Sequence, residues 1–472
     1  MLLALVACSD PPPRDDDGDG HVVPMDCADD DPAIHPDAGE TCANGVDDDC
    51  DGIAAGCGPA GWMDVRDAPA RVLADPEAGY LFGAALAGDA DGDGVADLAL
   101  RASDGRASTV WVVSAALEGD LPLRATDPVF TDETDGFELA AGDLDGDGLA
   151  DLVLPSWDPG TGTGGAYLLR SPLGADLGAG DADAVLVALG AFRAARAALP
   201  GDVDGDGLAD VVLADPDASR DSPWGGAVWV VPGDVSGTRD LDDAGVRLDG
   251  GYARQAGLAL TGGDLDGDGL AEVVVGTRGD VRVVTAPLVA GRLADASDRI
   301  GGDPSLGEAV ALGDGDGDGH ADLLLGAAFA GWDGDTNRGA AWLLAGPFVG
   351  DRTVDDAVAT VEGAPGTWAA GFVVALPGDL DGDDRGEIAL ECDVGLGARG
   401  VALFRGGLAG TWDTRDAFAF LTGEPGDALG AKIVGTGDPD GDGWGDLFLL
   451  APLAQEDGVI GAGWRVPGGP GL

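Results

Sequence analysis

The chain has 472 residues, with 87 aspartates and glutamates against 25 lysines and arginines, which gives a formal net charge of −62. Nucleic-acid binding needs a basic surface, so this balance argues against a nucleic-acid partner. The 84 glycines and 28 prolines would indicate disorder if they were spread without order. The glycines instead recur within a short acidic motif and alternate with apolar segments, which favours a large fold built from repeats.

The chain begins with a short apolar segment that is followed by Cys8. The segment is too short to span a bilayer and has no basic residues at its start. Residues 5–8 resemble a bacterial lipobox, which implies that residues 1–7 are a signal-peptide remnant, that Cys8 carries a lipid and that residues 8–14 are a tether. Ser9 after the cysteine implies delivery to the bacterial outer membrane, and hence an exported cell-surface lipoprotein. The alternative is a chance Ala-Cys pair.

Residues 15–60 form a small module rich in cysteine and aspartate. One group of acids has the 1, 3, 5 and 12 spacing of an EF-hand loop, and a second group is a shorter acidic nucleus. The first group is Asp15, Asp17, Asp19 and Asp26, and the second is Asp47, Asp49 and Asp51. Residues 26–52 resemble the MopE-type metal-binding motif of bacterial surface proteins. That family name implies copper, but carboxylate oxygens are hard ligands that favour calcium.

The cysteines of this module are consistent with export. Cys27, Cys42, Cys50 and Cys57 can form two disulfides, and three connectivities are possible. A short segment with little apolar content needs such bonds or a bound metal in order to fold. A further cysteine, Cys392, lies in a later apolar run and is expected to be a buried free thiol.

Residues 61–472 are dominated by an acidic loop that occurs seven times with the pattern D-x-D-G-D-G-x-x-[DE]. Aspartates fill positions 1, 3 and 5 of every copy, and an aspartate or a glutamate fills position 9. In chain order the copies are Asp89, Asp91, Asp93 and Asp97; Asp143, Asp145, Asp147 and Asp151; Asp202, Asp204, Asp206 and Asp210; Asp264, Asp266, Asp268 and Glu272; Asp314, Asp316, Asp318 and Asp322; Asp379, Asp381, Asp383 and Glu387; Asp438, Asp440, Asp442 and Asp446.

The spacing predicts a calcium (Ca²⁺) site in each loop. Alternate residues of a tightly curled loop turn their carboxylates toward one centre, the carbonyl of position 7 can add another oxygen, and calcium takes about six to eight oxygen ligands. Glycines at positions 4 and 6 permit the positive φ of such a curl. The sixth copy has Asp384 at position 6, so we expect that site to be distorted or the weakest. Plain Asp-Gly turns would not need four filled carboxylate positions in every copy.

Each loop joins two apolar segments, which predicts a tight hairpin of two strands. A third strand carries an aromatic residue in most units, and a fainter outer strand follows, as at residues 357–361 and 417–421. The aromatic residues are Trp111, Tyr167, Trp229, Trp342, Phe404 and Trp464. Four strands in a unit of ~40–60 residues are typical of propeller blades.

Residues 82–84 (Phe-Gly-Ala) and the acidic loops resemble the FG-GAP (VCBS) repeats of integrin α-subunits and of secreted bacterial proteins. The resemblance spans roughly residues 62–472, although the other Phe-Gly positions are degenerate. It implies an all-β fold, a seven-bladed β-propeller of four-stranded blades at residues 61–472. Because the last unit lacks an outer strand, we expect residues 71–73 to lie beside residues 464–466 and to close the ring. The alternative is an open array, which needs polar capping ends.

The sequence contains no catalytic signature, and we expect the protein not to be an enzyme. Its three histidines, His21, His35 and His320, fall at positions of acidic loops where the backbone coordinates. By analogy with the integrin α head, the preferred function is a calcium-binding cell-surface module for adhesion to an extracellular protein or glycan. The ligand is expected on loops away from the acidic hairpins.

Two alternatives remain open at this point. The first is a polysaccharide-degrading enzyme on a propeller scaffold, for which Arg193, Arg196 and Arg254 could reach the central channel. The second is a purely structural surface scaffold. Depolymerisation assays separate the first alternative from a binding module.

Overall fold

The computed structural model describes residues 61–469, apart from 76, 78, 105–106, 135–137, 159–162, 189–195, 220–222, 332–336, 366, 396–397 and 457–458, and it also describes residues 28 and 34. Gly61–Gly469 is one compact unit. Several predicted residues lie outside the described part of the chain: Cys8, Asp15, Asp17, Asp19, Asp26, Cys27, Cys42, Asp47, Asp49, Cys50, Asp51, Cys57 and Arg193. No helix among the described residues is long and apolar enough to cross a membrane.

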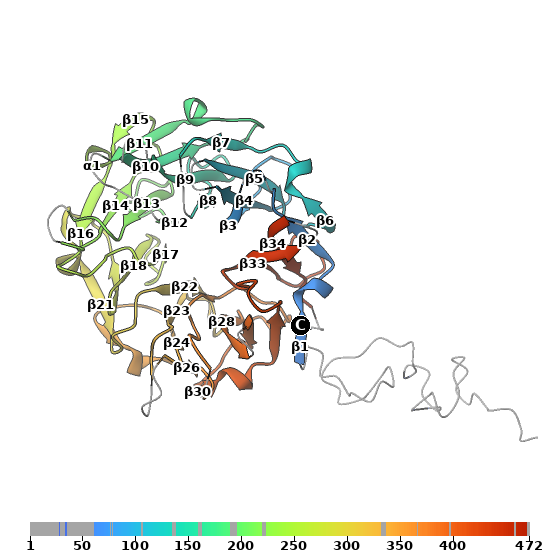
Figure 1. Ribbon diagram of the computed structural model, residues 1–472. Coiled ribbons are helices and arrows are strands. Elements are labelled where there is room, and N and C mark those ends of the chain that lie inside the picture. The colour runs from blue at the N-terminus through green and yellow to red at the C-terminus, as the bar shows by residue number, and fades with distance from the viewer. Residues whose placement is uncertain are drawn as a thin grey trace, which may run out of the picture. The chain divides into compact units, whose positions relative to one another are not determined.

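Seven sheets follow one another around a ring, as the strand labels of Figure 1 show. In each sheet the chain runs outward from an innermost strand, and neighbouring innermost strands contact one another around the whole ring. The innermost strands are β3 (Tyr80–Gly88), β8 (Ala140–Gly142), β12 (Arg196–Gly201), β17 (Leu260–Gly263), β22 (Ala309–Gly313), β27 (Val374–Ala375) and β32 (Lys432–Gly437). The all-β, seven-bladed propeller predicted from the repeats is therefore confirmed.

The second strand of each blade is buried over most of its length because it lies between the blades on either side. These strands are β4 (Asp97–Ser103), β9 (Asp151–Asp158), β13 (Asp210–Asp215), β18 (Glu272–Thr277), β23 (Asp322–Ala327), β28 (Ile388–Gly395) and β33 (Asp446–Glu456). Six of them begin at the position-9 acid of the preceding loop, and β28 begins one residue after it. The acidic loop is thus the turn that starts the central strand of the blade.

The third strands carry the predicted aromatic residues. They are β5 (Ser108–Ser114), β10 (Thr163–Leu169), β14 (Ala227–Val231), β19 (Asp280–Val284), β24 (Ala340–Leu344), β29 (Ala398–Phe404) and β34 (Val459–Val466). Trp111, Trp229, Trp342 and Trp464 are at most 4% exposed. The first three each pack in a cluster formed by residues of two sheets. The six aromatic positions read from the sequence all lie in these strands.

The fourth strands complete the antiparallel part of each blade. They are β7 (Phe130–Asp132), β11 (Ala184–Ala188), β16 (Val246–Asp249), β21 (Ser297–Gly301), β26 (Ala359–Glu362), β31 (Ala419–Thr422) and, in the last blade, β2 (Ala70–Leu73). The strand β2 pairs antiparallel with β34, with Arg71 opposite Trp464 and Leu73 opposite Ala462. In Figure 1 the strands β2 and β34 lie side by side. The predicted closure by an N-terminal strand is confirmed.

Six of the seven sheets carry a fifth strand, which the four-stranded prediction did not include. It pairs parallel with the outer strand of the preceding blade. Five of these strands come from the connection between the third and fourth strands of a blade, whereas β1 precedes the fourth strand β2 in the chain. The fifth strands are β6 (Gly119–Pro122), β15 (Gly237–Asp240), β20 (Gly291–Arg292), β25 (Arg352–Thr353), β30 (Gly410–Asp413) and β1 (Gly61–Asp64). Each covers a sheet edge that would otherwise be free to pair with another chain.

A helical turn follows each fifth strand and redirects the chain into the fourth strand of its own blade. These turns are η1 (Val65–Asp67), η2 (Leu123–Ala125), α1 (Leu241–Ala244), η4 (Leu293–Asp295), η5 (Val354–Asp356) and η6 (Thr414–Asp416), while η3 (Ala179–Asp181) has the same place in the second blade. The segment at 61–73 therefore adds β1 to the sixth blade and β2 to the seventh. The N-terminal part of the propeller closes the ring at two places rather than one.

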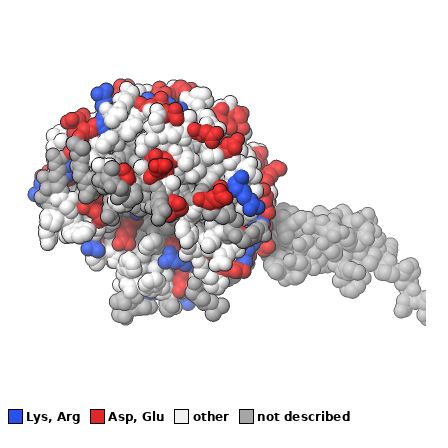
Figure 2. Space-filling view, turned by 45° about the horizontal axis from the view of Figure 1, so that its top comes forward, with Lys and Arg blue, Asp and Glu red and all other residues white. Residues whose placement is uncertain are grey.

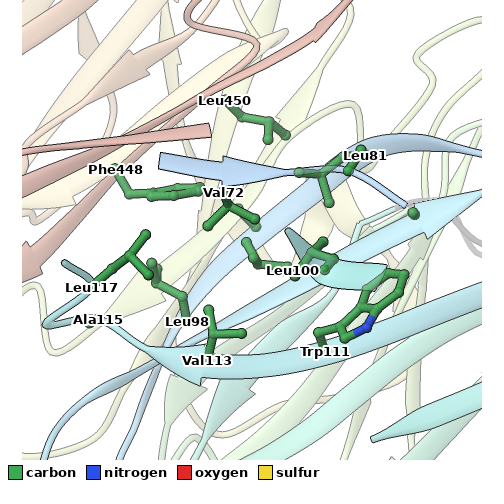
Figure 3. Close-up of a cluster of buried hydrophobic side chains, with 14 of the residues drawn as sticks. Val72, Leu81, Leu98, Leu100, Trp111, Val113, Ala115, Leu117, Phe448 and Leu450 are labelled. Carbon is green, nitrogen blue, oxygen red and sulfur yellow. The ribbon is translucent and has the colours of Figure 1, made fainter. Parts of the chain in front are cut away.

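The hydrophobic core is divided among the interfaces between blades. Figure 3 shows one of these clusters, in which Val72 of β2 and Phe448 and Leu450 of β33 meet Leu98 and Leu100 of β4. The cluster joins the last blade to the first. Burying one such side chain contributes roughly 1.5–3 kcal/mol, so the closing interface is stabilised in the same way as the interfaces within the ring.

Candidate metal centres

The seven acidic loops lie at one end of the blades, because each connects the innermost strand to the second strand. In the first loop Asp89 accepts hydrogen bonds from the backbone N–H of Gly92 at 2.7 Å and of Gly94 at 3.0 Å. These glycines have φ values of 85° and 88°, which L-residues rarely adopt. Asp93 accepts from the N–H of Val95 at 2.8 Å. The hydrogen bonds to the position-1 carboxylate thus hold the loop in a tight curl around that side chain.

The same hydrogen bonds recur in the other loops. Position 1 accepts from the N–H of positions 4 and 6, and position 5 accepts from the N–H of position 7. The position-1 residues are Asp143, Asp202, Asp264, Asp314, Asp379 and Asp438. The position-5 residues are Asp147, Asp206, Asp268, Asp318, Asp383 and Asp442. His320 is exposed at position 7 and takes part through its backbone.

This curl gathers carboxylate oxygens. In the first, second, fourth and fifth loops, oxygens of positions 1, 3 and 9 lie within 4.8 Å of one another. In the third loop the gathered positions are 1, 3 and 5, namely Asp202, Asp204 and Asp206. Carboxylates at this separation repel one another unless a cation lies between them. The predicted clusters are therefore present in these five loops, and their donor set is all oxygen.

The position-9 carboxylates are buried beneath the loops. In the first six loops they accept a hydrogen bond from the N–H of position 2, as Asp97 does from Ala90 at 3.0 Å. Burial raises the pKa of Asp97, Asp151, Asp210 and Asp322 to about 6, that of Glu272 to about 7 and that of Glu387 to about 8. A positive charge in the loop would offset the cost of ionising them.

Two buried carboxylate oxygens of these loops have no hydrogen-bond partner among the described residues. They are Oδ1 of Asp210, at position 9 of the third loop, and Oδ1 of Asp381, at position 3 of the sixth. A buried oxygen of this kind costs free energy unless a donor or a cation satisfies it. The residues present therefore fit a bound metal, held by the carboxylates of positions 1, 3, 5 and 9.

The loops also join neighbouring blades. The N–H of position 8 donates to the position-1 carbonyl of the preceding loop, as from Ala150 to Asp89 and from Ala271 to Asp202, both at 2.7 Å. The same bond links the fifth loop to the sixth and the sixth to the seventh. The remaining oxygen of Asp151 accepts from the N–H of Ser171 at 2.7 Å, at the end of the third strand. A metal ion bound at one loop would therefore stabilise an interface between two blades.

The sixth loop keeps this pattern despite its substitution. Asp384 has a φ of 66°, and its N–H donates to Asp379 at 2.9 Å as a glycine does in the other loops. The loop is not distorted in its hydrogen bonding, and its lower metal affinity stays a prediction. The strain of an aspartate in the left-handed region is local.

Replacing Asp384 with glycine is expected to raise the free energy of unfolding by about 1 kcal/mol, because the strain is removed and the hydrogen bonds are kept. Urea denaturation measures the change. The matched control is Gly207→Asp at the same position of the third loop, where a Cβ meets no atom within 4 Å, so that only the backbone conformation is tested. If both variants have the stability of the parent, position 6 is not under strain.

The seventh loop differs from the others in a way that the motif did not reveal. Its position 2 is Pro439, which has no N–H to donate to the position-9 carboxylate of Asp446. The guanidinium of Arg465, whose side chain is 5% exposed, donates to Asp446 at 2.7 Å through Nε and also contacts Asp440. Beside Arg465 the pKa of Asp440 is lowered, while burial raises that of Asp446.

The position of Arg465 is aliphatic in every other blade. Strand pairing aligns it with Val112, Leu168, Val230, Val283, Leu343 and Leu403. An arginine at this strand position is therefore particular to the last blade. Its guanidinium contacts positions 3 and 9, whereas Arg170 and Arg405, which follow the third strands of the second and sixth blades, approach position 3 alone. Among the described residues, no guanidinium contacts position 9 in the other six loops, whereas in the seventh Arg465 offsets part of the negative charge of the four carboxylates.

Comparison with known families agrees with this geometry. Residues 264–325 match the family described as FG-GAP-like repeat. The matched segment holds the fourth loop, its β18 and β19 strands and the fifth loop. Residues 26–55 match the family described as "Putative metal-binding motif", of MopE type. The chain thus carries an FG-GAP-like repeat in its propeller and a metal-binding motif before it.

The solved structures that match this chain are distant in sequence. The "Crystal structure of BBS1N in complex with ARL6DN, soaked with lead" is 12% identical, with a TM-score of 0.35, and the match covers 83% of this chain and 94% of that one. The "Structure of Dos1 propeller" is 7% identical, with a TM-score of 0.40, and the match covers 85% and 95% of the two chains. No curated protein matches the sequence.

Other residues singled out from the sequence lie apart from the loops. Cys392 is a buried free thiol, as predicted, and burial raises its pKa to about 12. Arg196 lines a pocket of about 330 Å³ at the mouth of the central channel, where Glu138 pairs with it at 2.8 Å and with Lys432 at 2.9 Å. Arg254 does not line this pocket and contacts the buried Asp280 at 3.4 Å.

Proposed function

We propose that the protein is a calcium-braced binding module for an extracellular protein or glycan, and not an enzyme. The observation that carries the proposal is the distribution of exposed aromatic side chains. Among the described residues, Tyr80, Trp224, Tyr252, Phe329, Trp368 and Phe372 are between 42% and 75% exposed. All six lie at the end of the blades opposite the acidic loops, and among the exposed large aromatics only Trp412 lies elsewhere. Exposed aromatic residues of this kind are characteristic of binding surfaces.

Calcium is the metal that the loops favour. Four carboxylates and a backbone carbonyl are hard oxygen donors, and calcium accepts about six to eight of them with flexible geometry. Magnesium demands a near-octahedral set and keeps several waters. Calcium would then stabilise the blades at one end, and the exposed aromatic residues at the opposite end would bind the ligand.

A binding role fits the charged groups of the central pocket better than a catalytic one. Lys432, the sole lysine of the chain, and Arg196 both pair with Glu138, which lowers the pKa of that carboxyl to about 2. Groups that neutralise one another in this way are poor acids and bases near neutral pH. The proposal places the protein outside the bacterial cell, anchored through lipid on Cys8 and with two disulfides among Cys27, Cys42, Cys50 and Cys57.

The proposal is tested with the full chain on arrays of glycans and of matrix proteins, in calcium and in a chelator, with magnesium as the control ion. We expect binding in calcium that is lost in the chelator and is not restored by magnesium. The bound glycan is also sized after incubation and should keep its length. Binding to none of these ligands in calcium, or shortening of a glycan, would show the proposal to be wrong.

A further inference from the structure

A second pocket lies between the fifth and sixth blades, at the end opposite the acidic loops. Its volume is about 210 Å³, comparable to one sugar ring, and it is formed by the connection from β26 to β27 and by the hairpin of β28 and β29. The residues that line it are Trp368, Ala369, Glu391, Cys392, Asp393, Ala398 and Arg399. The pocket combines an aromatic wall with a carboxylate and a guanidinium.

Only one of the two carboxylate oxygens of Glu391 has a hydrogen-bond partner among the described residues. The residue is 2% exposed, and its Oε1 accepts a hydrogen bond from Arg399 at 2.5 Å. Its Oε2 is buried and has no hydrogen-bond partner among the described residues. An unsatisfied buried carboxylate oxygen costs free energy that a donor in the pocket would recover. The missing partner is therefore not among the described residues, and a hydrogen-bond donor of a ligand in the pocket can supply it.

Two further aromatic side chains contact residues that line this pocket. Trp368 is 54% exposed, Phe329 is 42% exposed, and their ring centroids lie 6.4 Å apart in an edge-to-face arrangement. The guanidinium of Arg399 lies over the ring of Phe372 at 5.5 Å. Flat apolar rings beside charged hydrogen-bonding groups are suited to a ligand that has both an apolar face and polar edges.

The pocket is held in place by backbone hydrogen bonds. Ala369, beside Trp368, has a φ of 59°, and its N–H donates to the carbonyl of Asn337 at 2.9 Å. The N–H of Gly371 donates to the carbonyl of Glu391, also at 2.9 Å. The aromatic wall and the carboxylate are thus fixed to each other before a ligand arrives. Such pre-organisation reduces the entropy lost on binding.

We propose that this pocket binds a neutral sugar ring of a glycan, with one ring face against Trp368. The inference rests on the proposed function and names its ligand class. One sugar hydroxyl donates to Oε2 of Glu391, and a neighbouring hydroxyl accepts from Arg399, because a hydroxyl serves in both ways. An acidic sugar would bring its carboxylate against Glu391 and Asp393, on a chain with a net charge of −62 that shows more acidic than basic side chains on the face drawn in Figure 2. A cationic peptide side chain would meet Arg399.

The test is calorimetric titration of the calcium-loaded full chain with soluble oligomers of glucose, mannose and galactose, and with a polyuronate of the same length. We expect a neutral oligomer to bind. Trp368→Ala should weaken that binding roughly tenfold or more, and Glu391→Gln should weaken it by about tenfold. Trp412→Ala is the matched control, because Trp412 is an exposed tryptophan, 36% accessible, that lies apart from the aromatic end of the blades, and it should bind as the parent does.

The outcomes separate this inference from the proposed function. Equal affinity of the Trp368→Ala variant and the parent, tighter binding of the polyuronate, or binding of a matrix protein alone would overturn the sugar pocket and leave the binding module intact. Failure to bind any glycan or protein in calcium would overturn both. Melting curves of each variant in calcium establish that it is folded.

Discussion

Removal of calcium is expected to lower the melting temperature of the full chain by on the order of 10 °C or more. Each bound ion stabilises the folded state by about 2.7 kcal/mol when free calcium is 100 times the dissociation constant. Six loops fit an ion, and each loop that binds one also strengthens contacts between blades, as the bond from Ala150 to Asp89 illustrates. Differential scanning calorimetry in calcium and in a chelator measures the change.

The size of this change should depend on pH. Burial raises the pKa of position-9 acids such as Asp151, to about 6, and Glu387, to about 8, above the values of the unfolded chain, near 4. The metal-free folded state therefore binds more protons than the unfolded state between about pH 4 and pH 8. The stabilisation that these raised pKa values contribute to the metal-free folded state is fully present below about pH 4 and is lost as the pH rises to about 8. Calcium binds the ionised carboxylates, so its stabilisation grows over the same window.

We accordingly expect the difference in melting temperature between calcium and chelator to be small near pH 5 and large near pH 8. Magnesium at the same concentration serves as the control and should recover little of the difference. A melting temperature that the chelator leaves unchanged at pH 8 would contradict the proposed calcium sites. A difference that shrinks as the pH rises would contradict the role assigned to the buried position-9 acids.

Local sequence patterns were sufficient to predict most of this fold. The acidic loops mark the turn between the first two strands of each blade, and six of the second strands begin at the position-9 acid itself. The closing strand was predictable because the last unit lacks an outer strand and an unassigned apolar segment precedes the first. These features depend on short-range chemistry: glycine in the left-handed region, alternation of apolar residues, and the need to cover sheet edges.

The features that the sequence did not reveal depend on contacts between distant segments. The fifth strands are as short as Gly291–Arg292 and pair with a neighbouring blade, so they have no periodicity of their own to detect. Glu391 looks like an ordinary residue of an apolar strand, and only the fold shows that its Oε2 is left without a partner. Arg465 could have been noticed in the sequence, because the aligned positions of the other blades are aliphatic. Its role is visible only in the fold, where it contacts Asp446.

The Arg465→Leu variant is expected to be less stable than the parent in the absence of calcium and to recover its stability when calcium is added. Leucine is the residue that the second, fifth and sixth blades have at this position. Without calcium the change leaves the fully buried Asp446 with no countercharge, and breaking a buried ion pair from one side costs about 3–5 kcal/mol. With calcium the seventh loop becomes free to take an ion, which recovers stability through binding.

Two measurements on the full chain test this expectation. Calcium counted by metal analysis or native mass spectrometry should rise by one ion per chain in the variant, and this difference does not depend on how many ions the N-terminal module holds. The melting temperature should fall in the chelator and recover in calcium. Arg405→Leu is the matched control, because Arg405 is half exposed and pairs with Asp381 at 3.2 Å, and exposed pairs contribute about 0–1 kcal/mol.

An unchanged calcium count in the Arg465→Leu variant would mean that the seventh loop already binds an ion, or that it cannot bind one. The double variant with Pro439→Ala distinguishes these cases, because it restores the N–H that the other six loops direct at position 9. If the double variant also keeps the parent count, the guanidinium of Arg465 does not stand in for a cation. If it gains an ion, the arginine and the proline together account for the difference between the closing blade and the rest of the ring.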